Sequence, residues 1–382
     1  MAIAFGVLDV SDCDDFGDDA DILVVPARPG VPLALHATGA GLWRRLVAAS
    51  VPDEELDEDE RVVVREMAEA GLATTRHDHP ARVRVIAKPW LVSPMHELVY
   101  ALVQSVAREH GIRSVFIKGP VLHRQGLRDR EHSGDVDVWV EPGSEGALAE
   151  AMAAWGWTVV PFDFASVMYH SLTLESPGWG CEIDVHFRYP GVGADTDKAF
   201  ALLSETAETY EFGGVRALAP APTFGAIISA LHAVRPDPKW DRGESGRSAA
   251  VLVLQRAGEG CIDDAARWGA LPALVDVMAA AFPDTRLPED VGPLPADWIR
   301  RQAPSAIAYH LAVLRSLPWR ERPLAVFRTI WPSARTAQLS SATRGKPVKS
   351  PLKARLSRLG YGVKLIWEDS ARSVARRRRN RE

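Results

Sequence analysis

The sequence predicts an α/β (α+β) protein with a mixed sheet at its core, a small winged-helix-like domain before it and a helical region after it. Short apolar runs alternate with helical patterns across residues 81–197, which is typical of a sheet covered by helices. A hairpin pattern followed by two amphipathic stretches occupies residues 1–80. Apolar residues at helical spacing fill residues 198–332, and a linker with a basic helix is expected in residues 333–382.

The first region is expected to contain a hairpin and two helices. Residues 21–36 alternate apolar and polar side chains around the turn sequence PARPG, which indicates two paired strands. Residues 38–49 and 61–71 carry apolar side chains at helical spacing, and Gly71 is a typical stop for the second helix. The acidic residues 50–60 are expected to form a loop between the two helices.

The second region is expected to form the mixed sheet. Ser93 and Pro94 make a good helix start, and apolar residues follow at helical spacing as far as Gly111. The elements expected after this helix are a strand at 113–119, a short helix at 121–122, a strand at 135–140, a helix at 144–156, and strands at 157–162, 170–176 and 180–189.

The remaining chain is predicted to be mainly helical. The patterns indicate helices in residues 223–234, 246–258, 262–282 and 305–317. A linker rich in Pro, Ser, Thr and Lys is expected from about residue 333, followed by a basic helix from about residue 352.

Charge is distributed unevenly along the chain, whose net charge is −5. Residues 1–60 hold 14 acidic residues and 3 arginines, whereas residues 343–382 hold 13 basic and 3 acidic residues. Such polarity indicates an interaction tail, or ends that pair with each other or are simply solvated. The apolar stripe of the basic helix, at Leu356, Leu359, Val363 and Trp367, favours docking on the acidic N-terminal domain over a membrane or nucleic acid.

Composition excludes several classes of protein. The apolar runs fall short of the roughly 18 residues that a membrane-spanning helix needs, and the acidic N-terminal segment does not resemble a signal peptide. Cys13, Cys181 and Cys261 are far apart, with no disulfide or metal-type spacing, so a cytoplasmic location is expected. The sequence also lacks a P-loop, a dinucleotide fingerprint and a nucleophile elbow.

The segment SGDVDVWV places two carboxylates on one face of a predicted strand. Because side chains alternate along a strand, Asp135 and Asp137 point to the same side, and the intervening valines point into a core. Burying charge is costly unless it is compensated. Carboxylate oxygens select hard cations, so the pair predicts a Mg²⁺ site that takes its other ligands from phosphates.

The segment CEIDVHF supplies further polar side chains on a second predicted strand. Glu182, Asp184 and His186 share one face, opposite three apolar residues. Asp184 is the expected third metal ligand beside Asp135 and Asp137. His186 is expected to meet a phosphate or to orient a ligand.

A Lys-Gly pair ends the strand at 113–119. A glycine at a strand-to-helix turn lets backbone N–H groups approach a phosphate, and the N-terminus of the next helix favours negative charge. Gly119 is expected in this role, and Lys118 is expected to neutralise phosphate as a point charge.

Together these motifs resemble the DNA polymerase beta-type nucleotidyltransferase superfamily, and more narrowly its group of uncharacterised bacterial nucleotidyltransferases. The resemblance covers about residues 85–260. It implies an enzyme that uses Mg²⁺ and a nucleoside triphosphate such as ATP, with Asp135, Asp137 and Asp184 as catalytic metal ligands. The residues it assigns to nucleotide binding are Lys118, Gly119, Arg130, Ser133, Gly134 and His186, and His170 also matches the group's pattern.

The sequence departs from this family at two points. The superfamily's Gly-Ser pair is Gly119-Pro120 here, so a hydroxyl contact to phosphate is lost. The acidic residue that group members often carry in the helix near residues 247–254 is absent. These losses affect the expected triphosphate and acceptor contacts respectively.

Residues 1–80 resemble the PqqD-like domain, which recognises leader peptides in enzymes that modify ribosomally made peptides. The matching pieces are the strand pair, the helix start LHATGAGLWRRL and the closing segment REMAEAGLATT. The resemblance implies a precursor peptide as a partner. The acidic loop in place of a middle helix departs from the pattern, and a small cap without a ligand is the alternative.

Three functions therefore remain open. The first is transfer of a nucleotidyl group to an acceptor hydroxyl, on a ribosomally made peptide or a small molecule. The second is a non-catalytic peptide-binding scaffold that keeps the nucleotidyltransferase fold. The third is sugar transfer from a nucleotide-sugar at the same metal site, because a metal clamp on a diphosphate does not fix which group leaves. Binding to nucleic acid is not expected.

Overall fold

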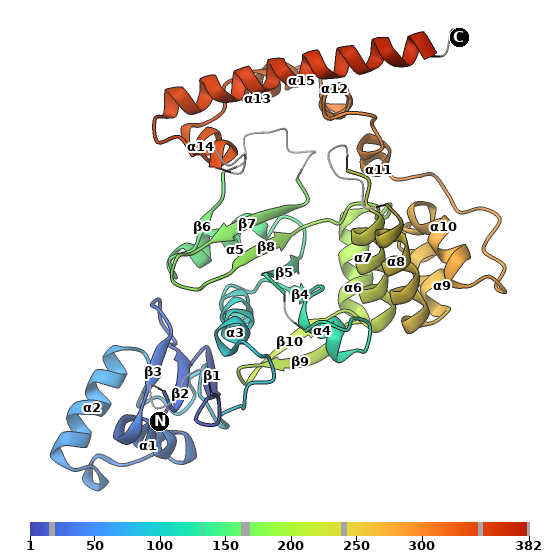
Figure 1. The fold of residues 1–382 in the computed structure, drawn as a ribbon. Coiled ribbons are helices and arrows are strands. Elements are labelled where there is room, and N and C mark those ends of the chain that lie inside the picture. Colours follow the sequence, from blue (N-terminus) through green and yellow to red (C-terminus); the bar gives the residue numbers. More distant parts are fainter. Residues whose placement is uncertain (15–19, 132, 162–168, 238–242, 343–346, 380–382) are drawn as a thin grey trace.

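A five-stranded mixed sheet lies at the centre of the molecule (Figure 1). The computed structural model describes residues 1–14, 20–131, 133–161, 169–237, 243–342 and 347–379. The strand order is β4-β5-β8-β7-β6; β5 and β8 are parallel, and the other neighbours are antiparallel. The strands are β4 (Ser114–Phe116), β5 (Asp135–Val140), β6 (Thr158–Val159), β7 (Ser171–Glu175) and β8 (Glu182–His186). The mixed α/β fold class is thus confirmed.

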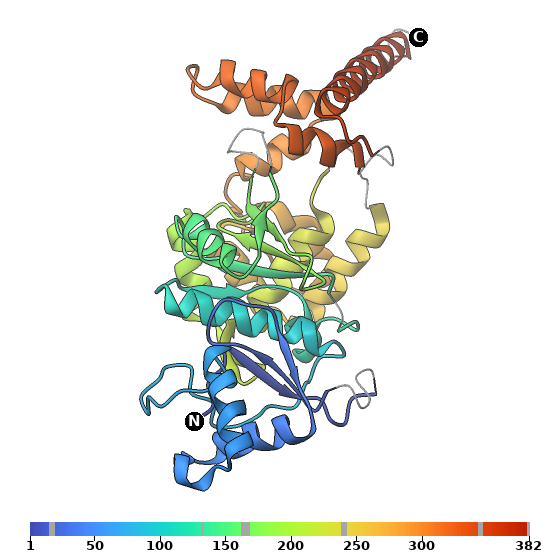
Figure 2. The same ribbon diagram turned by 90° about the vertical axis from the view of Figure 1, so that its left-hand side faces the viewer.

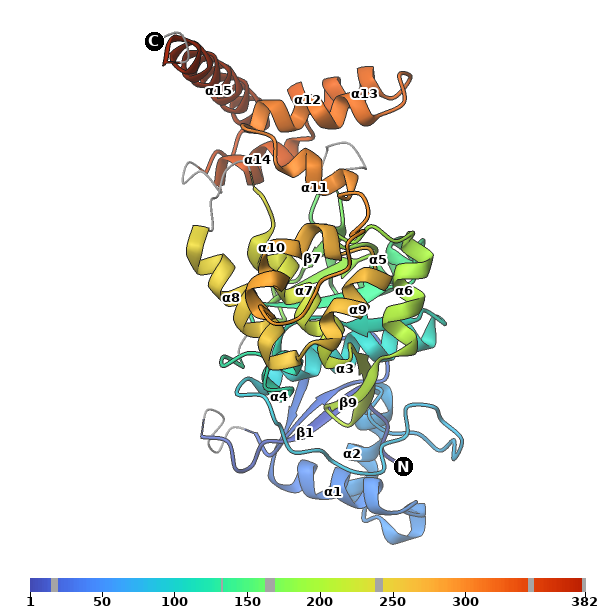
Figure 3. The same cartoon turned by 90° about the vertical axis from the view of Figure 1, so that its right-hand side faces the viewer.

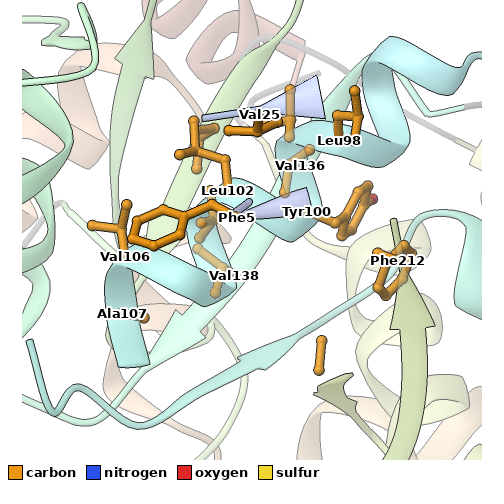
Figure 4. Packing of buried hydrophobic residues seen from close by; sticks show 14 of the residues in the cluster. Phe5, Val25, Leu98, Tyr100, Leu102, Val106, Ala107, Val136, Val138 and Phe212 are labelled. Carbon is orange, nitrogen blue, oxygen red and sulfur yellow. The ribbon is translucent and has the colours of Figure 1, made fainter. Parts of the chain in front are cut away.

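The alternating apolar residues of β5 and β8 divide between two cores. Val136 and Val138 pack with helix α3 (Pro94–Glu109) and helix α5 (Glu145–Ala153) on one face. Figure 4 shows that Phe5 and Val25 from the N-terminal region join the same cluster. On the other face, Trp139 belongs to a second core built largely from the helices after β8.

The N-terminal region contains three strands and two helices. The predicted hairpin is present as β2 (Ile22–Val25) and β3 (Leu33–Leu35), and β1 (Gly6–Asp9) is a further strand paired with β2. The fully buried Trp43 on helix α1 (Ala37–Ala48) donates its indole N–H to the Leu72 carbonyl at 3.0 Å. A 3₁₀ turn, η2 (Asp53–Glu55), lies within the acidic segment, and helix α2 (Glu58–Glu69) begins there because Asp57 and Glu60 form a capping box.

An antiparallel hairpin, β9 (Glu208–Phe212) and β10 (Val215–Ala219), interrupts the region predicted to be mainly helical. Its turn residues Gly213 and Gly214 have φ of +52° and +75°, as two-residue hairpin turns require. The buried Glu97 carboxylate accepts a hydrogen bond from the Gly213 N–H at 2.9 Å, and burial raises the pKa of Glu97. The same carboxylate accepts from the N–H groups of Trp90 and Leu91 at 2.9 and 3.1 Å.

The helices of the second core differ from the predictions in two ways, because α6 was not predicted and one predicted helix is divided. The stretch predicted as residues 262–282 is split, because Gly269 adopts φ +68° between two helices. The helices on this side are α4 (Pro120–Arg124), α6 (Thr196–Glu205), α7 (Pro222–Val234), α8 (Gly243–Ala257), α9 (Gly260–Arg267) and α10 (Leu271–Ala281).

The last part of the chain forms a separate layer of helices at the opposite end of the molecule from α1 and α2 (Figures 2 and 3). It consists of α11 (Ala296–Arg301), α12 (Ala306–Ser316), α13 (Arg322–Ile330), α14 (Ala334–Ala342) and α15 (Pro351–Arg379). The predicted linker thus contains α14. Among the described residues, none of the helices has both the length and the apolar character needed to cross a bilayer.

Helix α15 packs against α14 rather than against the acidic N-terminal region. The Arg355 guanidinium donates to the Pro332 carbonyl at 2.9 Å and lies 5.3 Å from the Trp331 ring centroid, and Ala354 is fully buried. The predicted docking on the acidic N-terminal domain is therefore wrong. Opposite charges favour such a contact. The helices that precede α15, however, place it at the other end of the molecule, where the two charged segments do not meet.

A chain ending at Ser350 should have a lower melting temperature than the full chain, because α14 loses the helix that covers it. We also expect newly exposed apolar surface, measured as increased binding of a fluorescent hydrophobic dye. An unchanged melting temperature, together with loss of salt-sensitive RNA or anionic-vesicle binding, would instead make α15 an external contact.

Candidate active site

The parallel register of β5 and β8 brings the predicted carboxylates together. Asp137 lies opposite Asp184, and Trp139 lies opposite His186. Ligand-capable atoms of Asp137, Asp184 and His186 all lie within 4.8 Å of one another. Asp135, opposite Glu182, shares the face but lies outside this cluster. His186, which was expected to meet a phosphate or to orient a ligand, therefore lies at the centre of the site, beside Asp137 and Asp184.

Asp137 is the buried centre of the site, with a 3% exposed side chain. Its Oδ1 accepts a hydrogen bond from Lys118 Nζ at 2.6 Å and lies 2.8 Å from His186 Nε2. Burial opposes ionisation of Asp137, but Lys118 and His186 outweigh it and hold the pKa of Asp137 well below its usual range. Burial likewise works against the Lys118 ammonium, but the neighbouring Tyr189 and Asp137 raise the pKa of Lys118. Both groups are therefore charged at neutral pH.

The Asp137 contact also fixes the tautomer of a neutral His186 ring. An ionised carboxylate can only accept hydrogen bonds, so Nε2 must carry the proton that it donates to Asp137. The lone pair then lies on Nδ1, which is buried and has no hydrogen-bond partner among the described residues. In this arrangement His186 orients Asp137, which matches the role of a residue that supports a metal ligand.

Hydroxyl groups hold the other two aspartates. Ser133 Oγ donates to Asp135 Oδ1 at 2.9 Å. Thr173 Oγ1, on β7, donates to Asp184 Oδ1 at 2.5 Å. Sequence reasoning missed Thr173, because its position opposite Asp184 depends on the register of β7 with β8.

The Lys118-Gly119 turn has a left-handed backbone at both residues, with φ of +64° and +63°. Glycine adopts this conformation freely, whereas a residue with a side chain does so at a cost. Directly below the turn lies Tyr100, whose buried hydroxyl has no partner among the described residues. Helix α4 after the turn has only five residues, so it is too short to provide the anion-binding N-terminus expected from the sequence.

The remaining predicted residues surround this centre at different depths. Gly134 is exposed immediately before β5, and Arg130 is exposed too. Arg128 is half-buried and lies in the field of Asp135 and Asp137, although burial and the nearby Arg130 lower its pKa. Sequence reasoning missed Arg128. The ring of His170 lies 5.5 Å from that of His186, and burial, together with His186 and Arg235, lowers the pKa of His170 well below its usual range.

The donor set fits a divalent cation. Asp137 and Asp184 offer carboxylate oxygens of the kind that Mg²⁺ prefers, and Asp135 adds a third on the same face. The oriented carboxylate of Asp137 and the oriented carboxylate of Asp184 match the hydrogen-bonded ligands found at metal sites. Lys118 adds a positive charge beside the same oxygens, where a phosphate group would also be attracted.

We predict that Gly119→Ala destabilises the protein more than Gly126→Ala does. Both glycines have positive φ, but a Cβ at Gly119 would lie 2.7 Å from Tyr100 Oη, whereas a Cβ at Gly126 would meet nothing within 4 Å. The backbone strain common to both should cost about 1–2 kcal/mol, and the overlap at Gly119 should add about 1–3 kcal/mol. Urea unfolding measures both losses.

The double variant Gly119→Ala with Tyr100→Phe serves as the control for this contact. Removing the Tyr100 hydroxyl should restore part of the free energy of unfolding lost in Gly119→Ala. If the losses of unfolding free energy in Gly119→Ala and Tyr100→Phe simply added in the double variant, the Tyr100 hydroxyl would not be what the Cβ at residue 119 overlaps.

Comparison with known proteins finds similarity to solved structures but not to family models or curated proteins. No family model matches the chain, and no curated protein matches it. The antibiotic-resistance factor ANT(2'')-Ia aligns with 10% identity and a TM-score of 0.33, over 50% of this chain and 98% of its own. An antigenic nucleotidyltransferase-like protein from Paracoccidioides brasiliensis aligns with 12% identity and a TM-score of 0.31, over 50% of this chain and 98% of its own.

A tRNA nucleotidyltransferase, solved with a primer tRNA and an incoming ATP analog, aligns with 15% identity and a TM-score of 0.21, over 72% of this chain and 99% of its own. Two of the three neighbours are thus described as a nucleotidyltransferase or as nucleotidyltransferase-like. Similarity at these TM-scores assigns no activity to this chain, which has to be inferred from the site itself.

Proposed function

We propose that this chain is a Mg²⁺-dependent nucleotidyltransferase that transfers a nucleotidyl group from a nucleoside triphosphate to an acceptor hydroxyl. The observation that supports this most is the cluster of Asp137, Asp184 and His186, whose ligand-capable atoms lie within 4.8 Å of one another. Lys118 and His186 stabilise the ionised Asp137, and Asp184 on the neighbouring strand adds a second carboxylate, so the pair offers oxygen ligands to one divalent cation.

In this proposal Asp135, Asp137 and Asp184 hold the metal. Bound Mg²⁺ would neutralise the charge of the phosphates and orient them for in-line attack. His186 keeps the Asp137 carboxylate in position, and Thr173 and Ser133 do the same for Asp184 and Asp135. His186 and Thr173 lie on β8 and β7, and Ser133 lies in the segment just before β5, so the sheet and the start of β5 together hold the carboxylates in place.

Asp184 is proposed as the base for the acceptor hydroxyl. The acceptor oxygen forms a bond to the α-phosphorus while the bond from that phosphorus to the bridging oxygen breaks, and pyrophosphate leaves. The hydroxyl proton passes to the Asp184 carboxylate, which already accepts one hydrogen bond from Thr173 Oγ1. Asp184 is half-buried, which leaves room for the acceptor to approach.

Lys118 and the backbone of Gly119 are proposed to hold the nucleotide phosphates, with Ser133, Gly134 and Arg130 as further nucleotide contacts. His186, also expected from the sequence to contact the nucleotide, is buried against Asp137 and acts through that carboxylate instead. The Lys118 ammonium is only 17% exposed and lies 5.5 Å from the Tyr189 ring centroid, so it is held in place rather than free in solvent. The half-buried Arg128 is positioned to support the same charges.

The N-terminal region is proposed to be PqqD-like and to contact a precursor peptide that carries the acceptor. The three-stranded sheet followed by two helices supports this proposal, and β3, which lies at the edge of that sheet, is the strand on which an extended peptide would pair. A non-catalytic peptide-binding scaffold is the second candidate, favoured by Pro120 in place of a phosphate-binding hydroxyl. Calorimetry with Mg-ATP separates the two, because a scaffold should bind no nucleotide.

Sugar transfer from a nucleotide-sugar is the third candidate, because the same carboxylates would clamp a diphosphate. The mass of the product distinguishes a nucleotidyl adduct from a hexosyl adduct.

We predict that Asp184→Asn lowers turnover at least about 100-fold, since the variant loses a charge that both the metal and the acceptor proton require. Pyrophosphate release with Mg²⁺, each nucleoside triphosphate and candidate acceptors measures the effect. Turnover should fall in the same way in Asp135→Asn and Asp137→Asn. Glu182→Gln is the matched control, because Glu182 lies on the same strand and face but is exposed and outside the cluster. Wild-type turnover in all three aspartate variants would contradict the assignment.

Lys118→Met should have opposite effects on metal and nucleotide. The ammonium occupies Asp137 Oδ1, so its removal should maintain or tighten Mn²⁺ binding, while Mg-nucleotide binding weakens by about tenfold or more. Lys88→Met, which removes an exposed lysine paired with Asp12, is the control. If Lys118→Met bound both Mn²⁺ and Mg-nucleotide more weakly than the original protein, Lys118 would only support the fold around Asp137.

A further inference from the structure

A second group of charged residues lies behind the metal site, on the side of His170. Arg235 caps the end of α7, and Arg301 is the last residue of α11. The Arg235 Nη1 lies 3.5 Å from His170 Nε2. The His170 ring in turn lies 5.5 Å from the ring of His186, which contacts Asp137. A short series of side chains therefore connects these arginines to the centre of the proposed active site.

Neither guanidinium is neutralised within the described part of the chain. Neither Arg235 nor Arg301 has a carboxylate oxygen within ion-pair distance, although twelve such pairs occur elsewhere. The Nε of Arg301 is buried and lacks a hydrogen-bond partner among the described residues. Burial lowers the pKa of Arg301 and the charge of Arg235 lowers it further, whereas Tyr309, Asp297 and Asp237 act in the opposite direction.

The positions of both arginines at helix C-termini offset part of this cost. A helix C-terminus carries the equivalent of about half a negative charge. Two full positive charges held near each other, both of them half-buried, still exceed what the two helix ends supply. An arginine whose donors are unused is also a costly way to stabilise a fold. These features are explained by a ligand with negative charge.

An open pocket of about 760 Å³ gives such a ligand access to the arginines. Its walls come from the ends of α7 and α11 and from parts of α8 and α10, and include Arg235, Arg247 and Arg301. Three acidic residues also line it, namely Asp237, Glu244 and Asp276. The pocket is thus not uniformly basic, and the position for an anion is the corner between Arg235 and Arg301, next to His170.

The pocket is separate from the turn proposed to hold the nucleotide. The start of α7 packs beside α4, the helix that follows Gly119, and a Cβ added at Gly225 would lie 3.0 Å from Leu122 and 3.7 Å from Leu127. Arg235 lies ten residues further along α7, which corresponds to about 15 Å of helix. Among the described residues, neither Lys118 nor Gly119 lines the pocket at the C-terminal end of α7.

We propose that Arg235 and Arg301 form a binding site for a phosphate group carried by the acceptor substrate. Two guanidinium groups present planar forks of donors that match phosphate oxygens, and their two positive charges match a phosphate dianion better than a single carboxylate. The assignment to the acceptor, although not the phosphate site itself, rests on the proposed nucleotidyl transfer. The site makes a phosphorylated small molecule or a phosphorylated peptide the expected acceptor class.

Calorimetry with inorganic phosphate tests the site without metal, nucleotide or turnover. Phosphate should bind the full chain, and Arg235→Met and Arg301→Met should each weaken binding at least tenfold. Arg286→Met is the matched control, because Arg286 is exposed, pairs with Glu289 and does not line the pocket as described. Arg301→Lys should keep part of the affinity, and melting temperatures identify any variant that fails to fold. No phosphate binding by the full chain, or equal binding by all variants, overturns the proposal.

A saturating non-hydrolysable nucleotide analogue with Mg²⁺ distinguishes the two sources of phosphate. Unchanged binding of inorganic phosphate supports an acceptor site, whereas its displacement means that the pocket holds the phosphates of the nucleotide and overturns the acceptor assignment. Asp184→Asn should retain phosphate binding. Phosphate binding without any nucleotidyl transfer would leave the phosphate site standing and would count against the proposed function alone.

Discussion

The buried contact between Lys118, Asp137 and His186 is the constraint on which the sheet depends. Its three members come from the end of β4, from β5 and from β8, so these strands must be neighbours for Asp137 to be compensated. The apolar residues on the opposite face fix the register, because a slip of one residue would turn Asp137 into the first core and Val138 out of it. Packing and charge thus select the same strand alignment.

This contact is better explained by binding than by stability. A buried ion pair contributes little net stability, because desolvation offsets most of its Coulomb energy, and replacement by apolar residues is often neutral or favourable. Lys118 additionally holds a left-handed backbone that is costly for a residue with a side chain. A sequence under selection for stability alone would have little reason to keep both features. They are consistent with a site in which a charged ligand replaces or shares the lysine contact.

The sequence predicted the alternating strands well, because Asp135, Asp137 and Asp184 interrupt regular apolar patterns and strand periodicity assigns their face directly. Thr173, Arg235 and Arg301 were out of reach, since the register of β7 and the ends of α7 and α11 place them. Arg128 was missed because it lies in the connection between α4 and β5, where no periodic pattern assigns a direction to its side chain. The β9–β10 hairpin was readable from its Gly213-Gly214 turn but was missed among helical patterns. The predicted position of α15 was wrong for a different reason. Net charge indicates that two segments attract each other, but not whether the chain between them allows them to meet.

The Glu97 carboxylate has a consequence for how the molecule unfolds. It binds backbone N–H groups of Trp90, Leu91 and Gly213, and the Gly213 carbonyl in turn accepts a hydrogen bond from the Val7 N–H at 2.9 Å. Phe5 and Val25 also share one core with α3 and β5. Residues 1–80 have a core of their own, but these contacts join them to α3 and to the central sheet. Opening of the hairpin at Gly213 would therefore disturb both the N-terminal strands and the Tyr100 side chain, which stacks on Phe212 beneath the Lys118-Gly119 turn.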